Sequence, residues 1–223
     1  QGKASDVTEL TIDGHTIQRS QSARNLGAVF DEHLSMEAHI KAVCRSAFFQ
    51  LKQISQIRNA LDMKTAQMFV HALVTSRMDY CNALLYGLPQ TLISKLQRVQ
   101  NQAARIVTGA HRSDHITPVL HQLHWLPVES RIHYKIMMLT YRALNGLAPQ
   151  YIRDLLKVYE PARSLRSDQK QLLVVPKTRL KTYDDRCYAH AAPKLWDQLS
   201  LSLRTADSLP KFKSLLKNHL CIF

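Results

Sequence analysis

The sequence predicts a mainly α-helical fold: an antiparallel helical bundle with a small N-terminal β-hairpin and strand element, and a basic irregular loop before the last helices. Three observations lead to this prediction. From residue 35 onward, apolar side chains recur at steps of three and four, as they do on one face of a helix. Before residue 31, short segments alternate between apolar and polar residues or are briefly apolar. Glycine and proline stand at the expected turns, such as Gly87-Leu88-Pro89 and Asn145-Gly146.

Residues 1–34 form the predicted β element. Residues 7–12 and 15–19 alternate around Asp13-Gly14, which is a strong signal for a two-residue hairpin turn. Residues 25–30 (NLGAVF) indicate a short buried strand, in which Gly27 marks a bulge or a close approach of another group to the backbone. Three short strands need a partner surface to be stable, so we expect this sheet to be the edge of something larger.

Residues 35–110 form the predicted helical bundle. Ser35 is the expected N-cap of a first helix, and Asp62 is the expected N-cap of a second. A third helix follows Gly87-Leu88-Pro89, because glycine suits the left-handed position that closes one helix and proline suits the start of the next. This third helix ends at Gly109. The expected apolar stripes are Met36, Ile40, Val43, Ala47, Leu51 and Ile54, then Ala66, Phe69, Leu73, Tyr80 and Leu84, then Leu92, Leu96, Val99, Ala103 and Ile106.

Residues 111–157 form a predicted helical extension. A short helix begins at Thr117-Pro118, a longer one runs from Pro127 to Asn145-Gly146, and a further short helix begins at Pro149. The core positions expected for the longer helix are Val128, Ile132, Ile136, Leu139 and Ala143.

Residues 158–186 lose this periodicity and concentrate positive charge, which predicts a basic loop. Within the loop, residues 172–175 (LLVV) could form a brief strand. Residues 187–223 regain a helical pattern over residues 189–199 and again over residues 208–220. Trp125 and Trp196 stand among apolar neighbours, so we expect both to pack in the core.

The chain is strongly basic. Its 223 residues contain 30 Lys and Arg against 17 Asp and Glu, a formal net charge of +13. Residues 1–58 hold 7 basic and 6 acidic side chains, so almost all of the surplus follows them. Such a field favours a polyanion, either nucleic acid or an anionic membrane surface. No apolar run approaches the roughly 20 residues that a membrane-spanning helix needs, so the sequence predicts no membrane span.

The four cysteines, Cys44, Cys81, Cys187 and Cys221, lie far apart and form no paired spacing. This pattern favours reduced thiols in an intracellular protein over a disulfide framework or a zinc module. The chain begins at Gln1 without an initiator methionine, and we therefore expect it to be a piece of a longer product.

Two groups of cations are candidate nucleic-acid contacts. In the helix after Pro89, Lys95, Arg98 and Arg105 follow steps of three and four beside the apolar stripe. This pattern fits a helix that packs on a core and lays its flank along a phosphate backbone. It also fits an ordinary solvated surface helix. The second candidate group lies in the basic loop and consists of Arg163, Arg166, Lys177, Arg179 and Lys181.

Two patterns that resemble catalytic or metal sites have a plainer interpretation. Tyr183-Asp184-Asp185 resembles the paired aspartates that hold metal ions in polymerases, but that motif has one residue between the aromatic residue and the first aspartate. We interpret this segment as a solvated turn whose aspartates balance Arg179 and Arg186. His121 and His124 lie three apart on a predicted helix, but a zinc site needs a third or fourth ligand and none is obvious. The sequence therefore predicts no catalytic residue, no metal site and no cofactor.

Several longer motifs occur in the order found in a known family. They are LGAVFDEHLSMEAHI at residues 26–40, SRMDYCN at 76–82, GLP at 87–89, LQRVQNQAAR at 96–105, HITPVL at 115–120, LHWLP at 123–127 and GLAP at 146–149. Over nearly its whole length, the chain resembles the C-terminal region of the reverse transcriptase encoded by jockey-like non-LTR retrotransposons.

The resemblance implies a place for each segment. The N-terminal strands would be the last strands of the palm, which form the primer grip, and the helices from Ser35 onward would be the thumb and the C-terminal extension. In the family, the catalytic aspartates lie upstream of a strand like that at residues 26–30, so the resemblance implies a chain that is inactive alone. The family pattern has glycine where this chain has Asp184, which agrees with an incidental aspartate pair. The resemblance also implies an intracellular, nuclear location.

The function expected from the sequence is that of a non-catalytic C-terminal fragment of an RNA-directed DNA polymerase. It would contribute to binding RNA and RNA–DNA hybrid through backbone contacts, with the upstream palm domain as a protein partner. Two alternatives stay open. One is a helical protein-interaction module that associates with itself through exposed apolar helix faces. The other is a relic reading frame without a selected function.

Overall fold

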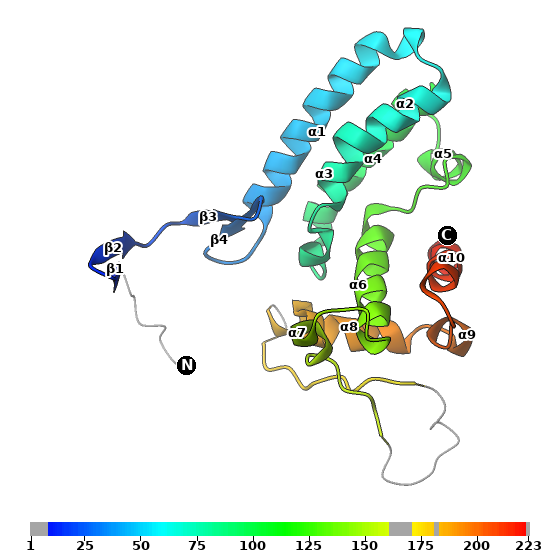
Figure 1. Ribbon diagram of the computed structural model, residues 1–223. Coiled ribbons are helices and arrows are strands. Elements are labelled where there is room, and N and C mark those ends of the chain that lie inside the picture. Colours follow the sequence, from blue (N-terminus) through cyan, green and yellow to red (C-terminus); the bar gives the residue numbers. More distant parts are fainter. Residues whose placement is uncertain (1–8, 161–170, 181–182, 222–223) are drawn as a thin grey trace.

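The computed structural model describes residues 9–160, 171–180 and 183–221. These residues form a mainly helical structure, as the sequence predicts. Figure 1 shows three parts: an N-terminal arm of two hairpins, a bundle formed by α1, α2, α3 and α4, and a second group of helices around α6.

The first hairpin confirms the prediction around Asp13-Gly14. Strand β1 (Glu9–Ile12) pairs antiparallel with β2 (His15–Gln18). Asp13 and Gly14 have φ angles of +49° and +78°, the positive values that a tight two-residue turn of the hairpin type requires. Both strands are exposed along their whole length, and Figure 1 shows this hairpin standing away from the helical body.

The expected strand over residues 25–30 is wrong. Two strands, β3 (Ser22–Asn25) and β4 (Ala28–Asp31), pair across a turn at Leu26-Gly27, whose φ angles are +45° and +87°. The two hairpins form separate two-stranded sheets and not one three-stranded sheet. The close approach expected at Gly27 is confirmed, because a Cβ atom there would lie 3.2 Å from Cε1 of Tyr80. The Tyr80 hydroxyl also donates a hydrogen bond to the carbonyl oxygen of Leu26.

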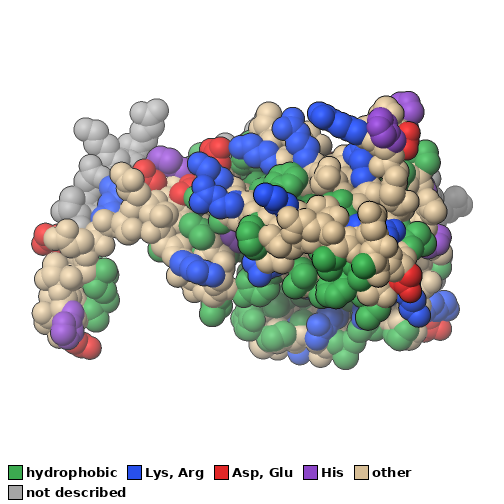
Figure 2. All heavy atoms as spheres, turned by 90° about the horizontal axis from the view of Figure 1, so that it is seen from above, with side chains coloured by type: hydrophobic (Ala, Val, Ile, Leu, Met, Phe, Trp, Pro, Cys, Tyr) green, Lys and Arg blue, Asp and Glu red, His purple; other side chains and the backbone are tan. Residues whose placement is uncertain are grey.

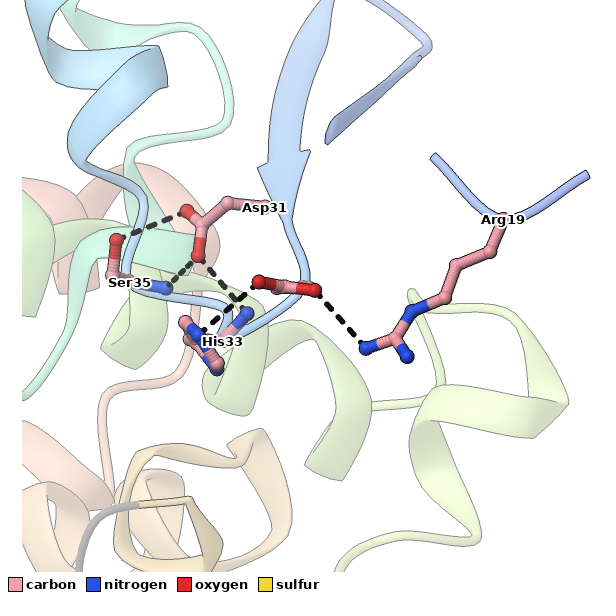
Figure 3. A network of polar contacts seen from close by, with 5 residues as sticks. Arg19, Asp31, His33 and Ser35 are labelled. Carbon is pink, nitrogen blue, oxygen red and sulfur yellow. Dashed lines mark hydrogen bonds and ion pairs between the residues drawn. The ribbon is translucent and has the colours of Figure 1, made fainter. Parts of the chain in front are cut away.

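A network around Asp31 joins β4 to helix α1 (Glu37–Ile57) (Figure 3). Oδ1 of Asp31 accepts hydrogen bonds from the backbone N–H of His33 at 3.1 Å and of Ser35 at 2.9 Å. Oδ2 accepts from the Ser35 hydroxyl at 3.0 Å and from the Met36 N–H at 2.9 Å. The N-cap is Met36 and not Ser35, although Oγ of Ser35 accepts the N–H of Glu37 at 3.2 Å. Asp31, five residues before the cap, therefore holds the chain at the start of α1.

Replacing Asp31 with alanine is expected to lower the free energy of unfolding by about 1–2 kcal/mol at pH 7, as for the loss of a helix cap. Burial alone would raise the pKa of Asp31, but the hydrogen bonds from Ser35, Met36 and His33 outweigh it and hold the pKa below its usual value. Because the pKa of Asp31 is lower in the folded state, its carboxylate contributes stability that is fully present above the unfolded-state pKa, about 3.9. This stability is lost as the pH falls through the folded-state pKa.

Urea unfolding at pH 7 and at pH 2 would measure this effect. Glu32→Ala is the matched control, because among the described residues the Glu32 side chain makes only surface ion pairs, with Arg19 and His33, and the change should alter stability by less than about 1 kcal/mol. The difference between wild type and Asp31→Ala should shrink in acid. A difference of the same size at both pH values would contradict the charged role of Asp31.

Helix α1 leads through a 3-10 turn (Arg58–Ala60) into α2 (Met63–Val70). Asp62 caps α2 as predicted, since its Oδ1 accepts the N–H of Thr65 at 2.6 Å. The helical path continues through a π-helical turn (His71–Thr75) into α3 (Ser76–Asp79), and a 3-10 turn (Asn82–Leu85) follows.

The predicted buried face of this second helical segment is largely wrong. Phe69, Tyr80 and Leu84 are exposed by 39%, 51% and 43%. The buried side chains are Ala66, Val70, Val74 and Met78. A π-helical turn contains more residues than an α-helical turn. Residues spaced by four therefore stay on the same, buried side of the helix across this turn. The apolar sequence pattern does not reveal this wider turn.

Helix α4 (Gln90–Thr108) completes the bundle and runs parallel to α1. Gly87 and Gly109 have φ angles of +68° and +75°, which confirms the predicted turn before α4 and the predicted end of α4. Lys95 near the start of α4 contacts Glu37 at the start of α1 at 3.1 Å. At the other end, Arg58 donates to the carbonyl oxygens of Ile106 and Val107 near the end of α4. The two helices are parallel because the segment that connects them, α2 and α3, runs in the opposite direction.

The second group begins with α5 (Ile116–Gln122), α6 (Val128–Leu144) and α7 (Gln150–Arg153). It continues with a 3-10 turn (Asp184–Arg186), α8 (Tyr188–Asp197), α9 (Leu201–Arg204) and α10 (Leu209–Leu220). The brief strand expected at residues 172–175 is not formed, since that segment makes only an isolated bridge between Leu173 and Val158. Trp125 and Trp196 are 5% and 1% exposed, as predicted for core residues.

One cluster of buried side chains connects both helical groups. It runs from Met36 to Leu216 and includes members from α1, α4, α6, α8 and α10. At its C-terminal end, the fully buried Phe212 stacks on Tyr141 with ring centroids 4.3 Å apart and lies 5.9 Å from the ring of Trp196. The outer surfaces of α1 and α4 therefore rest on a continuous core.

Candidate nucleic-acid interface

The basic flank predicted on α4 is present at the surface. Lys95 and Arg98 are exposed and Arg105 is half-buried. Lys95 pairs with Glu37, and Arg105 donates to the carbonyl oxygens of His111 at 3.3 Å and Asp114 at 3.1 Å. Arg98 has no hydrogen bond or ion pair with any residue that the structure describes. Arg98 is therefore the member of this flank with a fully available guanidinium.

Helix α1 carries a second set of cations that the sequence reasoning missed. Lys41, Arg45 and Lys52 are exposed and follow Glu37 at steps of four and seven, so they share one side of α1. Because Glu37 on this side reaches Lys95, this side of α1 borders α4. In the sequence, these cations of α1 show the same helical spacing as the cations of α4. Only the parallel packing of the two helices brings the two sets of cations onto one surface.

We call these six side chains the α1–α4 basic face. Its members are Lys41, Arg45, Lys52, Lys95, Arg98 and Arg105. Along the whole of α1 and α4, Glu37 is the sole acidic residue. In the view from above, Lys and Arg side chains gather along one edge of the helical body (Figure 2). The concentration of cations beside a single carboxylate suits a phosphate backbone better than it suits a neutral partner.

Two further observations describe the local surface. Phe48 is 44% exposed and lies on α1 between Arg45 and Lys52, where an aromatic ring could pack against a base or a sugar. Burial raises the pKa of the neighbouring Cys44 thiol, and the positive charge of Lys95 opposes that rise. The opposing effect of Lys95 is a second indication that this cation of α4 lies beside α1.

The structure describes only part of the second predicted group. Lys177 and Arg179 are exposed, whereas Arg163, Arg166 and Lys181 lie outside the described residues. No hydrogen bond or ion pair joins Lys177 or Arg179 to α1 or α4 in the described part of the chain. The structure therefore does not bring these two loop cations together with the α1–α4 basic face.

The predicted charge balance of the aspartate pair is confirmed only in part. Asp184 accepts hydrogen bonds from the backbone N–H groups of Arg179 and Leu180, at 3.0 Å each, and not from a guanidinium. These bonds, with that from Leu180 first, lower the pKa of Asp184, and the positive charge of Arg179 lowers it further, as the predicted balance requires. The Arg186 side chain instead donates to the carbonyl oxygen of Leu34 at 3.1 Å.

Asp185 likewise has a local partner, since it accepts the Thr178 hydroxyl at 2.6 Å. The two carboxylates thus hold a loop turn, as the sequence predicts, although their hydrogen bonds come from backbone N–H groups and a hydroxyl. His121 and His124 are both exposed. Within the described residues, no three His, Cys, Asp or Glu side chains are grouped as a metal site.

The outer surfaces of α1 and α2 also expose large apolar side chains. Phe49 on α1 is 60% exposed, and Met68 and Phe69 on α2 are 63% and 39% exposed. These side chains are the physical basis for the alternative of a protein-interaction module.

Among the described residues, every helix is too short or too polar to cross a membrane. No protein-family model, no curated protein and no solved structure matches the chain.

Proposed function

We propose that this chain binds the phosphate backbone of nucleic acid through the α1–α4 basic face. The sequence resemblance specifies the substrate class as an RNA template paired with a DNA primer. In this proposal the chain is the non-catalytic, template–primer-holding part of an RNA-directed DNA polymerase, and an upstream palm domain supplies the chemistry. The observation that carries the proposal is the parallel packing of α1 on α4, which places two rows of cations side by side.

The dimensions of the face suit a backbone. From Lys41 to Lys52 and from Lys95 to Arg105, the cations extend about 15 Å at about 1.5 Å per residue. A surface of that length passes several successive phosphates on each strand of a duplex. Contacts from Lys and Arg to phosphates position a protein on the duplex without reading sequence, which is what a polymerase thumb requires.

The test is binding of the purified chain to RNA–DNA hybrid, single-stranded RNA and duplex DNA across a salt series. We expect the tightest binding to the hybrid, with log affinity falling linearly with log salt. Two triple variants divide the face: Lys41, Arg45 and Lys52 to Gln on α1, and Lys95, Arg98 and Arg105 to Gln on α4. Each should reduce the salt slope by about 2 to 3, because each removes up to three phosphate contacts.

The matched control replaces Arg142, Lys194 and Lys213 with Gln. These cations are exposed on α6, α8 and α10, so the control removes the same net charge away from the face. The control should keep the wild-type slope. An equal reduction of the salt slope in all three variants would show that only overall charge matters and would contradict the proposal. Equally weak binding to all three nucleic acids would contradict it as well.

The exposed Phe49 and Met68 favour a second candidate function, a module that associates with another copy of itself. The same preparations distinguish the two functions when their mass is followed by sedimentation. Dimerisation that Met68→Ser abolishes, together with no salt-dependent binding of nucleic acid, would support the second function and replace the first.

A further inference from the structure

A polar cavity of about 460 Å³ lies away from the α1–α4 basic face. Its walls come from α2 and the π-helical turn, the end of α3 and the 3-10 turn after it, the segment at residues 123–126, α6 and α10. We call it the Trp125 cavity. Its volume lies in the range of small-molecule sites in proteins.

Two polar side chains in this cavity lack partners. Asn82 and Trp125 are each only 5% exposed. Oδ1 of Asn82 and Nε1 of Trp125 are shielded from solvent, so a ligand in the cavity reaches them only after a local movement of the wall, and neither has a hydrogen-bond partner among the described residues. Buried polar atoms in folded proteins are almost always hydrogen-bonded. An amide and an indole N–H together call for a ligand that both donates and accepts hydrogen bonds, as the edge of a nucleobase does.

The wall beside Trp125 is aromatic. The His71 ring lies 5.3 Å from the Trp125 ring, tilted by 58°. Burial lowers the pKa of His71, and the nearby Arg131 lowers it further while Asp79 opposes the shift. The lowered pKa favours the neutral form of the imidazole, which presents an uncharged ring. Tyr134 adds a third ring to the lining, so the cavity suits a flat heterocycle.

The charge of the cavity is positive. Asp79 is the one carboxylate among its lining residues, and Arg131 already pairs with it through two hydrogen bonds, one of them between Nε and Oδ1 at 2.8 Å. Lys135 and Lys217 also line the cavity, from α6 and α10, and both are exposed. These two ammonium groups have no ion pair within the described residues. They therefore favour an anionic group on the ligand.

We propose that the Trp125 cavity binds one nucleotide unit, with the base beside Trp125, His71 and Asn82 and the phosphate near Lys135 and Lys217. The proposal rests on the proposed function and adds to it a pocket for a single nucleotide. The unit comes either from an unstacked position in a bound strand or from a free mononucleotide. Both sources present the same ring and the same phosphate.

The test uses NMR of the ¹⁵N-labelled full chain, because its two tryptophans give only two indole N–H signals. Trp125→Phe assigns them. The probes are uridine and adenosine monophosphate, the two nucleosides and inorganic phosphate. We expect the monophosphates to shift the Trp125 signal saturably while the Trp196 signal, whose Nε1 donates to the Gln171 carbonyl at 3.0 Å, stays in place.

Substitutions then separate the two halves of the ligand. Lys135→Gln with Lys217→Gln should weaken monophosphate binding about tenfold and leave nucleoside binding unchanged. Lys213→Gln, an exposed cation on the same α10 that does not line the cavity, is the matched control. A short single-stranded RNA that shifts the signal at lower concentration than the monophosphates identifies the strand as the source. A response to monophosphates but not to RNA identifies the free nucleotide.

No shift of the Trp125 signal with any nucleotide, or an equal shift with inorganic phosphate alone, would overturn the proposal. This outcome is distinguishable from failure of the proposed function. The salt series with hybrid reports on the α1–α4 basic face, whereas the indole signal reports on the cavity. A persistent indole shift without hybrid binding would remove the function proposed for the face and retain the cavity.

Discussion

Replacing Phe212 with alanine is expected to lower the free energy of unfolding by about 3–5 kcal/mol, the largest effect predicted for this chain. Phe212 is fully buried in α10, where it stacks on Tyr141 of α6 and contacts the ring of Trp196 in α8. Truncation removes the ring from three helices at once and leaves a cavity between them. Urea unfolding followed by circular dichroism would measure the loss.

The control is Phe49→Ala, which removes the same ring from a position that is 60% exposed on α1 and should change stability by about 0.5 kcal/mol or less. Because one buried cluster extends from Met36 to Leu216, fluorescence and circular dichroism should follow the same transition. If fluorescence and circular dichroism followed two separate transitions in Phe212→Ala, the last helices would be an independent unit and the continuous core would not unfold cooperatively.

The second large effect is expected at Arg58, whose substitution by methionine should cost about 2–4 kcal/mol. Its guanidinium donates to three carbonyl oxygens: Nε to Ile106 at 2.7 Å, Nη1 to Leu61 at 2.7 Å and Nη2 to Val107 at 2.8 Å. These bonds join the end of α1 to the end of α4. Methionine keeps the aliphatic length but leaves all three carbonyls without this donor.

Arg58→Lys keeps the charge but cannot reproduce the planar fork, so it should recover only part of the stability. It should also weaken hybrid binding, since the ends of the α1–α4 basic face would no longer be held together although no charge is lost. Arg142→Met, at an exposed position on α6, controls for loss of a surface arginine. Full stability in Arg58→Lys would mean that charge at the helix ends suffices and that the three-carbonyl geometry does not matter.

The parts of the fold that the sequence predicts well depend on local chemistry. Gly87 and Gly109 adopt the positive φ that glycine permits, and Asp62 caps the helix that follows it. The turn at Leu26-Gly27 escaped prediction because leucine rarely occupies a turn position and its apolar neighbours suggested one continuous strand.

The candidate sites were less predictable because they depend on contacts between distant segments. Lys95 and Arg98 were identified from one helix alone, whereas Lys41 and Arg45 join the same face only through packing of α1 on α4. Arg58 gave no signal, since its carbonyl partners include two residues nearly fifty positions away. Asn82 and Trp125 line one cavity only when the second group of helices packs on the first.

The parallel packing of α1 on α4 also has a consequence for the order of folding. During synthesis α1 emerges first, and its natural neighbour is the returning segment of α2 and α3, because those contacts close short loops. The α4 row can join α1 only after that segment is in place. A chain that has folded only as far as α3 therefore presents one row of cations. If the proposed function holds, such a chain binds polyanions weakly, and tight binding requires the finished bundle of α1, α2, α3 and α4.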